Sequence, residues 1–528
     1  MPVFSHTIHR NIYIFGLLLL VFSLPLSMFG MSFSQLILLG NWVLEGNFRE
    51  KVKILKSRKS IWIFISIFIV HAFWLFPPQD YNYAYHDLRI KLPLLVLPLI
   101  VGTSKSLSKH LLRTILLVFT SGVLSGSLIS MAIFIFKPSV NITNYRELSV
   151  FISHIRFSLM VAFSVFILFY YSFIKNELAL TGWKKIIGIT ISVWFIIFLI
   201  LLKSLTGLLI FGVVSYLVLW FFTFKLKFWY KWFCFLILLI LPVIPGWYVY
   251  KVLKNFTQIE QIDYSKVDKK TKSGNDYFFN SESKSVENGK IVWAFCCEKE
   301  LVDGWTKKSK LNYLGKDKHG NELRYTLVRY LTSKGLRKDS AGISNLNNDD
   351  IKAIENGVPN YIFLNEWKIY PMIYNTIWEL YEYKNNKYAG GHSLPQRIEY
   401  LKAAKGIISK HYLFGVGTGN VQISFDKQYV QMKSLLEKEW RLRAHNQFVT
   451  FLLTFGVFGF VWILFAIFYP AIKENGFKDF LFSVFLIILL FSFINEDTIE
   501  TQAGLTFFVF FYCLFLFAKE QRVVQTKQ

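Results

Sequence analysis

Long apolar runs recur along this 528-residue chain, and they restrict its fold more than any other feature. A helix needs about 20 apolar residues to cross the hydrocarbon core of a bilayer. About twelve runs approach this length, although two of them are short. They cover residues 12–29, 32–44, 60–76, 92–102, 111–136, 149–174, 186–202, 205–224, 228–250, 447–469, 480–494 and 504–518. The sequence therefore predicts an all-α polytopic membrane protein with about twelve transmembrane helices.

The composition agrees with this prediction and narrows the class of partners. Hydrophobic residues make up 53% of the chain, yet its formal net charge is +25, which is typical of apolar spans joined by basic loops. The lysines interrupt the apolar runs instead of forming one basic face, so nucleic acid is not an expected partner. The expected partners are the lipid bilayer and phosphate-bearing lipids. No small-residue cleavage site follows the first run, and we interpret it as a retained span.

Basic residues are distributed unevenly among the loops, and this predicts an orientation. Lysine and arginine cluster at 49–59, 105–113, 175–185, 225–231, 473–478 and 519–527, whereas the short loops between these clusters carry few. By the positive-inside rule, the clusters and both termini face the cytoplasm. Three regions follow: an N-terminal transmembrane bundle of about nine spans over 1–250, a large external loop over 251–444, and about three C-terminal spans over 445–528.

The external loop is predicted to form a small mixed lobe. Alternating apolar residues over 323–330 suggest a strand. The stretch NNDDIKAIENG is typical of a short helix that Asn348 or Asp349 caps and that ends before Gly357. No spacing of cysteine or histidine in the chain predicts a metal site.

An amphipathic helix is predicted near 394–410, with Ser393 as its cap. Its apolar stripe consists of Ile398, Leu401, Ala404 and Ile408. Arg397 lies in the first turn, where a cation opposes the helix dipole. We therefore expect an anionic partner for Arg397, either a ligand or a carboxylate of the chain.

A glycine-rich turn, GVGTGN, follows this helix and contains Gly415 and Gly417. Such spacing is a weak signal for phosphate binding, and an ordinary turn explains it as well. Further on, the stretch RLRAHNQF places Arg443, His445 and Asn446 at the start of an apolar run. One explanation is interfacial anchoring, since long cations extend from helix ends to the headgroups. The other is a reaction site at the membrane surface.

Taken together, these stretches resemble the signature region of the O-antigen ligase family, which includes related O-antigen polymerases. The resemblance rests on the arginine that opens the amphipathic helix, on HYLFGVGTGN, and on AHNQFVTFLLTFGVFGF, and it covers about 397–460. The layout of about twelve spans with a large loop before the last ones agrees with it. The late segment NEDTIETQAGLTFFVFF is also similar to the end of family members.

The resemblance implies a metal-independent, inverting glycosyltransferase of the GT-C type that needs no cofactor. Such an enzyme transfers a glycan from undecaprenyl diphosphate to an acceptor hydroxyl, which for the ligases belongs to the lipid A–core of lipopolysaccharide. The expected location is the bacterial cytoplasmic (inner) membrane, with the active site facing the periplasm. The large loop over 251–444 would then be periplasmic.

This chemistry gives the candidate residues their expected roles. Negative charge develops on the diphosphate as the glycosidic bond breaks, and guanidinium groups match phosphate oxygens. Arg397 and Arg443 are candidates for that role. A neutral histidine can orient a hydroxyl and accept its proton near pH 7, which makes His445 the expected catalytic residue. Asn446, Gly415 and Gly417 are supporting residues, and for Asn446 capping of the span is the favoured role.

One position departs from the family pattern. The family carries an arginine at the start of an earlier span, and Leu205 occupies that place in LLKSLTGLLIF. Lys203, Arg156 and Arg89 are the candidates for the missing second diphosphate contact.

Two other functional classes compete with this interpretation. A transporter or flippase also has about twelve spans, but it would carry ionisable or helix-breaking residues near the midplane of paired repeats, and the sequence offers no such pair. A passive scaffold would not explain Arg397 and His445 at the outer face. Ligase and polymerase share donor and mechanism, and the sequence does not separate them.

Overall fold

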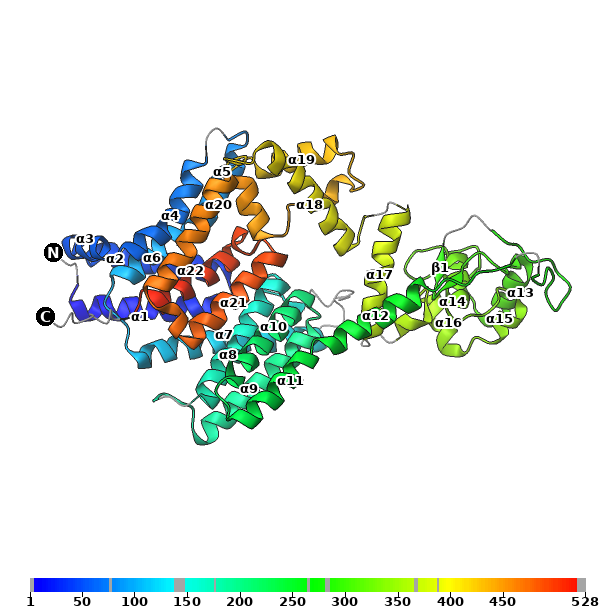
Figure 1. Ribbon diagram of the computed structural model, residues 1–528, viewed down its shortest axis with the longest axis horizontal. Coiled ribbons are helices and arrows are strands. Elements are labelled where there is room, and N and C mark those ends of the chain that lie inside the picture. The colour runs from blue at the N-terminus through cyan, green and yellow to red at the C-terminus, as the bar shows by residue number, and fades with distance from the viewer. Residues whose placement is uncertain are drawn as a thin grey trace. The chain divides into compact units, whose positions relative to one another are not determined.

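The computed structural model describes residues 4–75, 78–136, 148–174, 177–263, 266–280, 285–364, 369–386 and 389–519. The chain divides into two compact units. We call Met1–Lys227 with Gln396–Gln528 the bundle, and Phe228–Pro395 the second unit. In both units the regular secondary structure is almost entirely helical (Figure 1).

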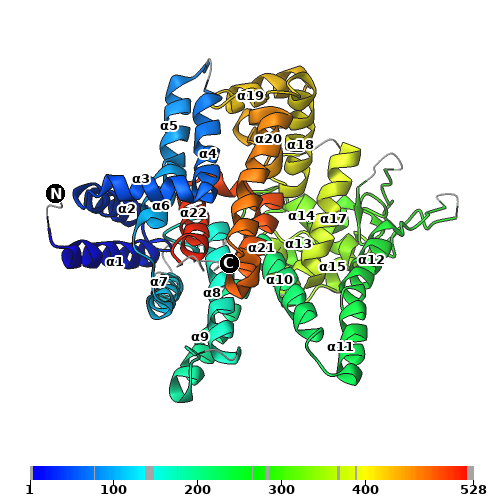
Figure 2. The same ribbon diagram turned by 60° about the vertical axis from the view of Figure 1, so that its left-hand side comes forward.

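The first part of the bundle consists of α1 (His6–Ser23), α2 (Met28–Leu44), α3 (Phe48–Ser57), α4 (Lys59–Phe73), α5 (Tyr81–Lys91), α6 (Pro93–Thr103), α7 (Lys109–Phe136), α8 (His154–Phe173), α9 (Gly182–Leu201) and α10 (Leu205–Thr223). Its second part consists of α18 (Ser393–Lys410), α19 (Val421–Gln431), η3 (Lys438–Trp440), α20 (Gln447–Lys473), η4 (Gly476–Lys478), α21 (Phe480–Asn495), η5 (Thr498–Glu500) and α22 (Gln502–Leu516). The first three residues of α18 fall in the second unit. The two parts pack against each other: α4, from the first part, and α20, from the second, lie side by side in both views (Figures 1 and 2).

Two helices form the centre of the bundle. Every residue of α8 from Phe157 to Leu168 is buried, and so is every residue of α22 from Ala503 to Leu516. A helix that is apolar on all sides belongs in a protein interior or in a membrane. The rings of Phe163, Phe485 and Phe511 join α8, α21 and α22, with centroids separated by 5.1 to 5.8 Å. The connection between α21 and α22 carries polar residues that are described below.

Each of the twelve predicted apolar runs contains a helix. Among the described residues, six helices are long and apolar enough to cross a membrane: α7, α8, α9, α10, the pair over Phe228–Thr257, and α20. Helices α2, α4, α21 and α22 are apolar but shorter. The chain is thus an all-α protein with the helices of a multi-pass membrane protein, as predicted, while the number of twelve spans stays a prediction.

The second unit contains α11 (Phe228–Ile240), α12 (Val243–Thr257), α13 (Glu298–Lys308), α14 (Leu323–Ser333), α15 (Ser340–Ser344), α16 (Asn348–Glu355), η2 (Tyr361–Leu364) and α17 (Ile369–Asn386). Strands β1 (Val286–Glu287) and β2 (Lys290–Ile291) pair antiparallel, with Val286 opposite Ile291. Trp305, Leu327 and Ile354 are fully buried in a core of its own.

The predicted strand over 323–330 is wrong, because this segment is helix α14. Leu323, Leu327 and Leu331 are fully buried at intervals of four residues, which is the repeat of a helix face. The Tyr330 hydroxyl also donates a 2.6 Å hydrogen bond to Asp350 Oδ1. The predicted mixed lobe is accordingly a helical one whose described part contains a single pair of two-residue strands.

The short helix near 348 is confirmed, but its cap is one residue earlier than predicted. Asn347 accepts a 2.8 Å hydrogen bond from the backbone of Asp350, and Asp350 bonds back to the backbone of Asn347 at 2.9 Å. This reciprocal arrangement satisfies two backbone donors that the first helical turn leaves without partners. Gly357 follows the helix with φ +76°, as its predicted position at the end requires.

The amphipathic helix near 394–410 is α18, but the predicted stripe is displaced. Leu401 is 44% exposed, and the buried face is formed by Glu399, Tyr400, Ala403, Ala404 and Ile407. The displacement arises because a tyrosine and a carboxylate with polar partners are buried here. Glu399 Oε2 accepts a 2.6 Å hydrogen bond from Ser434, so a carboxylate is tolerated on the buried side.

Candidate functional site

A buried carboxylate in the connection between α21 and α22 gathers the residues of the candidate site. Glu496 directly follows the last residue of α21, and its side chain is 3% exposed. Its Oε1 lies 2.9 Å from Nη2 of Arg397, which opens α18. Nη1 of Arg397 donates a 2.8 Å hydrogen bond to the carbonyl of Asn495. Arg397 thus has the anionic partner that its place in the first helical turn predicted, and that partner is a carboxylate 99 positions away in the chain.

Arg156 reaches the same carboxylate from α8. Its Nη1 lies 3.6 Å from the other oxygen of Glu496, Oε2. Its Nη2 donates a 3.2 Å hydrogen bond to the carbonyl of Asp497, and Nη1 a 3.3 Å bond to Ser153 Oγ. The Arg156 side chain is 12% exposed. Two guanidinium groups therefore share one carboxylate, which leaves an excess of positive charge around Glu496.

His445 lies against this carboxylate, just before α20. Its Nδ1 is 3.6 Å from Glu496 Oε2, and its ring lies 5.5 Å from the ring of Tyr400. The backbone of His445 is left-handed, with φ +48°, an uncommon conformation for a residue with a β-carbon. Asp497 holds that conformation, because its Oδ2 accepts the His445 amide at 3.2 Å while its Oδ1 accepts the Thr450 hydroxyl at 2.7 Å.

Asn446 explains why the helix begins directly after the histidine. Its side-chain oxygen accepts a 3.0 Å hydrogen bond from the amide of Val449, which makes it the N-cap of α20. Its Nδ2 donates a 2.8 Å bond to the carbonyl of Ile494 at the end of α21. Asn446 therefore caps one helix, as favoured from the sequence, and ties it to the next.

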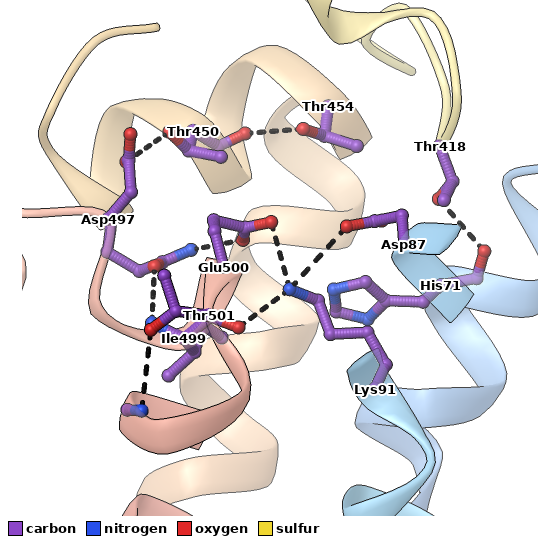
Figure 3. Close-up of polar contacts among 12 residues, drawn as sticks. His71, Asp87, Lys91, Thr418, Thr450, Thr454, Asp497, Ile499, Glu500 and Thr501 are labelled. Atoms are coloured by element: carbon purple, nitrogen blue, oxygen red, sulfur yellow. Dashed lines mark hydrogen bonds and ion pairs between the residues drawn. The ribbon is translucent and has the colours of Figure 1, made fainter. Parts of the chain in front are cut away.

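A second charge cluster surrounds Glu500 (Figure 3). Lys91, whose side chain is 0% exposed, places its Nζ 2.9 Å from Glu500 Oε2 and donates a 2.8 Å bond to the carbonyl of Ile499. Arg443 Nη1 lies 3.2 Å from the same oxygen of Glu500, and Gln447 Nε2 donates to its other oxygen at 2.9 Å. Arg443 thus pairs with Glu500, whereas Arg397 and Arg156 pair with Glu496.

The two clusters give neighbouring carboxylates different pKa values. Burial by itself would raise the pKa of Glu496, but His445, Arg156 and Arg397 outweigh it and hold that pKa below the usual range. Burial raises the pKa of Asp497, and the neighbouring Arg443 offsets only part of that rise.

Glu500 titrates like Glu496 rather than like Asp497. Burial opposes its ionisation, yet Lys91 and Arg443 lower its pKa well below the usual range. The connection between α21 and α22 thus presents two firmly ionised glutamates that hold cations in place.

Several buried donors of this region have no acceptor among the described residues. They are Arg156 Nε, Arg443 Nε and Gln396 Nε2, and Gln396 is adjacent to Arg397 in α18. Buried N–H groups nearly always have a partner, and leaving one unpaired costs about 1–3 kcal/mol. Arg156 Nε and Gln396 Nε2, each on or next to an arginine that pairs with Glu496, thus have hydrogen-bonding capacity that the described residues do not use.

The glycine-rich turn serves a different purpose from phosphate binding. The amides of Val416 and Gly417 donate 2.9 Å hydrogen bonds to the carbonyls of Leu453 and Thr454. The Gly415 amide donates to the carbonyl of His411, within its own segment. These carbonyls belong to α20 where the helix is interrupted. The turn is therefore a partner for the backbone of α20, and its amides are engaged within the protein.

The interruption of α20 lies at Gly456, which has φ +63°. The following residue, Val457, donates its amide to the carbonyl of Tyr412 at 3.0 Å, so the exchange of bonds runs in both directions. A β-carbon on Gly415 would lie 2.3 Å from the carbonyl oxygen of Thr454. Glycine at 415 thus allows the two backbones to approach one another.

Two candidate cations remain, Arg89 and Lys203. Arg89 is exposed on α5, with Nη2 3.2 Å from His86 Nδ1. Lys203 lies in the turn between α9 and α10, where its neighbour Ser204 approaches Ser158 of α8 at 3.3 Å. Among the described contacts, neither Arg89 nor Lys203 reaches Glu496. Leu205, at the first position of α10, is 51% exposed.

Sequence reasoning missed the carboxylates of the site. It used the segment NEDTIETQAGL only as part of a resemblance and gave Glu496, Asp497 and Glu500 no role. A signal was present, because three carboxylates within five residues between two apolar helices require cationic partners. Lys91 and Arg156 were the matching cations in the first half of the chain. In the described part, no group of three or more His, Cys, Asp or Glu side chains could hold a metal ion.

Residues 358–464 match the family model described as O-antigen ligase. The chain carries the domain of the O-antigen ligase family. The match contains Arg397, the glycine-rich turn, His445 and Asn446, and it confirms the resemblance seen in the sequence. Glu496 and Arg156 lie outside the matched residues. No curated protein sequence matches the chain.

Proposed function

We propose that this chain is a glycosyltransferase of the bacterial cytoplasmic membrane. It transfers a glycan from undecaprenyl diphosphate to an acceptor hydroxyl, and the reaction we favour is ligation of O-antigen to lipid A–core in lipopolysaccharide biosynthesis. The observation that carries the proposal is the convergence of Arg397, Arg156 and His445 on Glu496. It joins two phosphate-binding groups to a titratable ring in a chain with membrane-spanning helices and an O-antigen ligase domain.

The two arginines are suited to the diphosphate of the donor. Guanidinium groups stay charged and match phosphate oxygens with paired hydrogen bonds. The single carboxylate of Glu496 holds both groups in position without neutralising them completely. Placing them in advance favours a transition state in which negative charge grows on the leaving diphosphate. Arg156 also supplies the second arginine that the family carries at the position of Leu205.

His445 is suited to act on the acceptor. A hydrogen on Nδ1 facing Glu496 leaves the lone pair on Nε2 free for the acceptor hydroxyl, and the carboxylate stabilises the ring once it is protonated. The acceptor oxygen then bonds to the anomeric carbon while the bond from that carbon to the diphosphate oxygen breaks. The hydroxyl proton passes to Nε2. A single displacement of this kind inverts the anomeric centre.

The proposal requires the site to face away from the cytoplasm. A site on that side can use the lipid-linked donor, because the reaction needs no soluble nucleotide-activated sugar. The basic loop over 49–59 is the motivation for the orientation. Single cysteines at Ser57 and at Ser344, both exposed, test it with a membrane-impermeant thiol reagent on intact cells. Labelling of Ser344→Cys with protection of Ser57→Cys is expected, and the reverse pattern would contradict the orientation.

Transfer by purified protein, supplied with lipid-linked glycan and acceptor, tests the role of His445. His445→Ala should slow transfer by about 10² or more if the ring is a general base. If the residue only anchors the helix at the interface, His445→Trp should retain transfer, since tryptophan is favoured at membrane interfaces. His411→Ala, at an exposed histidine after α18, is the matched control and should transfer normally.

Polymerase activity is the second candidate, because it uses the same donor and the same chemistry. Deletion of the gene, followed by analysis of lipopolysaccharide on gels, separates the two. Loss of capped molecules with intact lipid-linked polymer identifies a ligase. Loss of chain length alone identifies a polymerase.

A further inference from the structure

The second unit contains a cavity that the proposed chemistry does not use. It has a volume of about 650 Å³ and lies between α12, the β1–β2 turn, η2 and α17. This volume falls within the range of roughly 300–1,000 Å³ that is typical of small-molecule sites. Three tyrosines and two asparagines provide most of its polar lining: Tyr361, Tyr370, Tyr374, Asn255 and Asn288.

The floor of the cavity is built from a rigid network. Tyr374 is 2% exposed, and its hydroxyl accepts the amide of Asn288 at 2.9 Å. The side-chain amide of Asn288 donates a 2.8 Å hydrogen bond to the carbonyl of Ser333, and its Oδ1 accepts a 3.1 Å hydrogen bond from Asn360 Nδ2. Asn360 in turn donates to the buried Glu287 at 2.8 Å. The floor therefore keeps its shape without a ligand, as a preformed site does.

The walls combine this floor with accessible side chains. Tyr361 is 42% exposed, Tyr370 is half-buried, and Asn255 is exposed on α12. The rings of Tyr370 and Tyr374 are nearly parallel, at 22°, with centroids 6.2 Å apart. The cavity thus presents ring faces next to hydroxyl and amide groups that can both donate and accept hydrogen bonds.

This lining fits one class of ligand. A sugar ring has a face of C–H groups that packs on an aromatic ring and an edge of hydroxyls that pairs with amides and phenols. None of the described residues that line the cavity is charged at neutral pH, which argues against a phosphate or an acidic peptide. An aliphatic ligand would leave the polar groups without partners, at a cost in binding.

We infer that this cavity is a saccharide-binding site that holds part of a glycan substrate apart from the residues that break the glycosidic bond. The inference rests on the proposed function for the identity of the glycan, which comes either from the lipid-linked donor or from the acceptor. Tyr361 and Tyr370 provide the stacking surfaces, and Asn255 provides the amide at the rim.

Binding of two lipid-free glycans to the full-length protein in nanodiscs tests the inference. The probes are the O-polysaccharide and the core oligosaccharide of the bacterium that carries the gene, each released from lipid and titrated by saturation-transfer NMR. Tyr361→Ala and Tyr370→Ala should each weaken binding of one probe by roughly tenfold. Tyr361→Phe should bind normally, because the ring is retained. The matched control is Tyr325→Ala, which removes a tyrosine of the same unit that is 41% exposed and lies outside the cavity.

The probe that depends on these tyrosines identifies the source of the glycan. Failure of the unsubstituted protein to bind either probe would overturn the inference, as would binding that neither alanine variant weakens. The same preparations assayed for transfer separate this inference from the proposed function. Normal transfer together with binding that neither alanine variant weakens overturns the saccharide site alone, whereas tyrosine-dependent binding by a protein that never transfers glycan overturns the proposed function alone.

Discussion

Replacing Glu496 by glutamine tests the central feature of the site, because it removes one charge and preserves the shape of the side chain. Glu496 Oε2 lies 3.6 Å from Nδ1 of His445, and the two side chains are 3% and 33% exposed. At about 4 Å, two unit charges interact by about 1 kcal/mol in bulk water and by about 4 kcal/mol at an effective dielectric constant of about 20. The partly exposed ring places this pair between the two limits, at about 2 kcal/mol.

If His445 accepts the proton of the acceptor, this interaction develops as the ring becomes charged. Its loss should then appear in the turnover rate, and about 1.4 kcal/mol corresponds to a factor of ten. Glu496→Gln should therefore slow transfer about thirtyfold at saturating substrate.

The assay measures transfer by purified protein with lipid-linked glycan and acceptor, normalised to the amount of folded protein. Glu474→Gln is the matched control, because it removes another glutamate, 11% exposed, that pairs with an arginine, Arg58, at 2.7 Å. It should lower stability without altering turnover per folded molecule. Turnover of Glu496→Gln within threefold of that of the unsubstituted protein would refute the proposed role of the carboxylate.

Two further predictions concern stability. Gly415→Ala should destabilise the protein far more than Gly46→Ala in thermal unfolding. Gly46 also has a positive φ, +66°, but has open space around it, so Gly46→Ala should cost only about 1–2 kcal/mol. Equal losses of stability would contradict the close approach of the two backbones at Gly415. Burial opposes ionisation of Glu300, but hydrogen bonds from Asn275, Thr271 and Ser340 lower its pKa from 4.5 to about 2. The ionised carboxylate therefore stabilises the protein at neutral pH, and this stabilisation is lost as the pH falls from 4.5 to 2. Hydrogen exchange in α13 should show this loss, which should be at most about 3 kcal/mol, and Glu300→Gln should show a flatter pH dependence.

The sequence by itself determined the apolar helices and several of the local signals. Apolar runs of membrane length need no distant partner to form a helix, so the predicted run over 205–224 and α10 agree within a residue at each end. Capping is equally local, which is why the roles of Asn446 and Gly357 could be predicted. A cation in the first turn of a helix was sufficient to predict an anionic partner for Arg397.

The tertiary structure alone decided which residues meet. Arg397 and Arg156 reach the backbone and side chain of the 496–497 segment across separations of 99 and 341 positions, and no local pattern contains that information. The helix over 323–333 and the displaced stripe of α18 have the same origin, because the burial of Leu327 or Tyr400 depends on elements distant in the chain. Local chemistry predicts that a charge in an apolar setting needs a counter-charge, whereas only the packing of the helices selects Glu496 as that counter-charge.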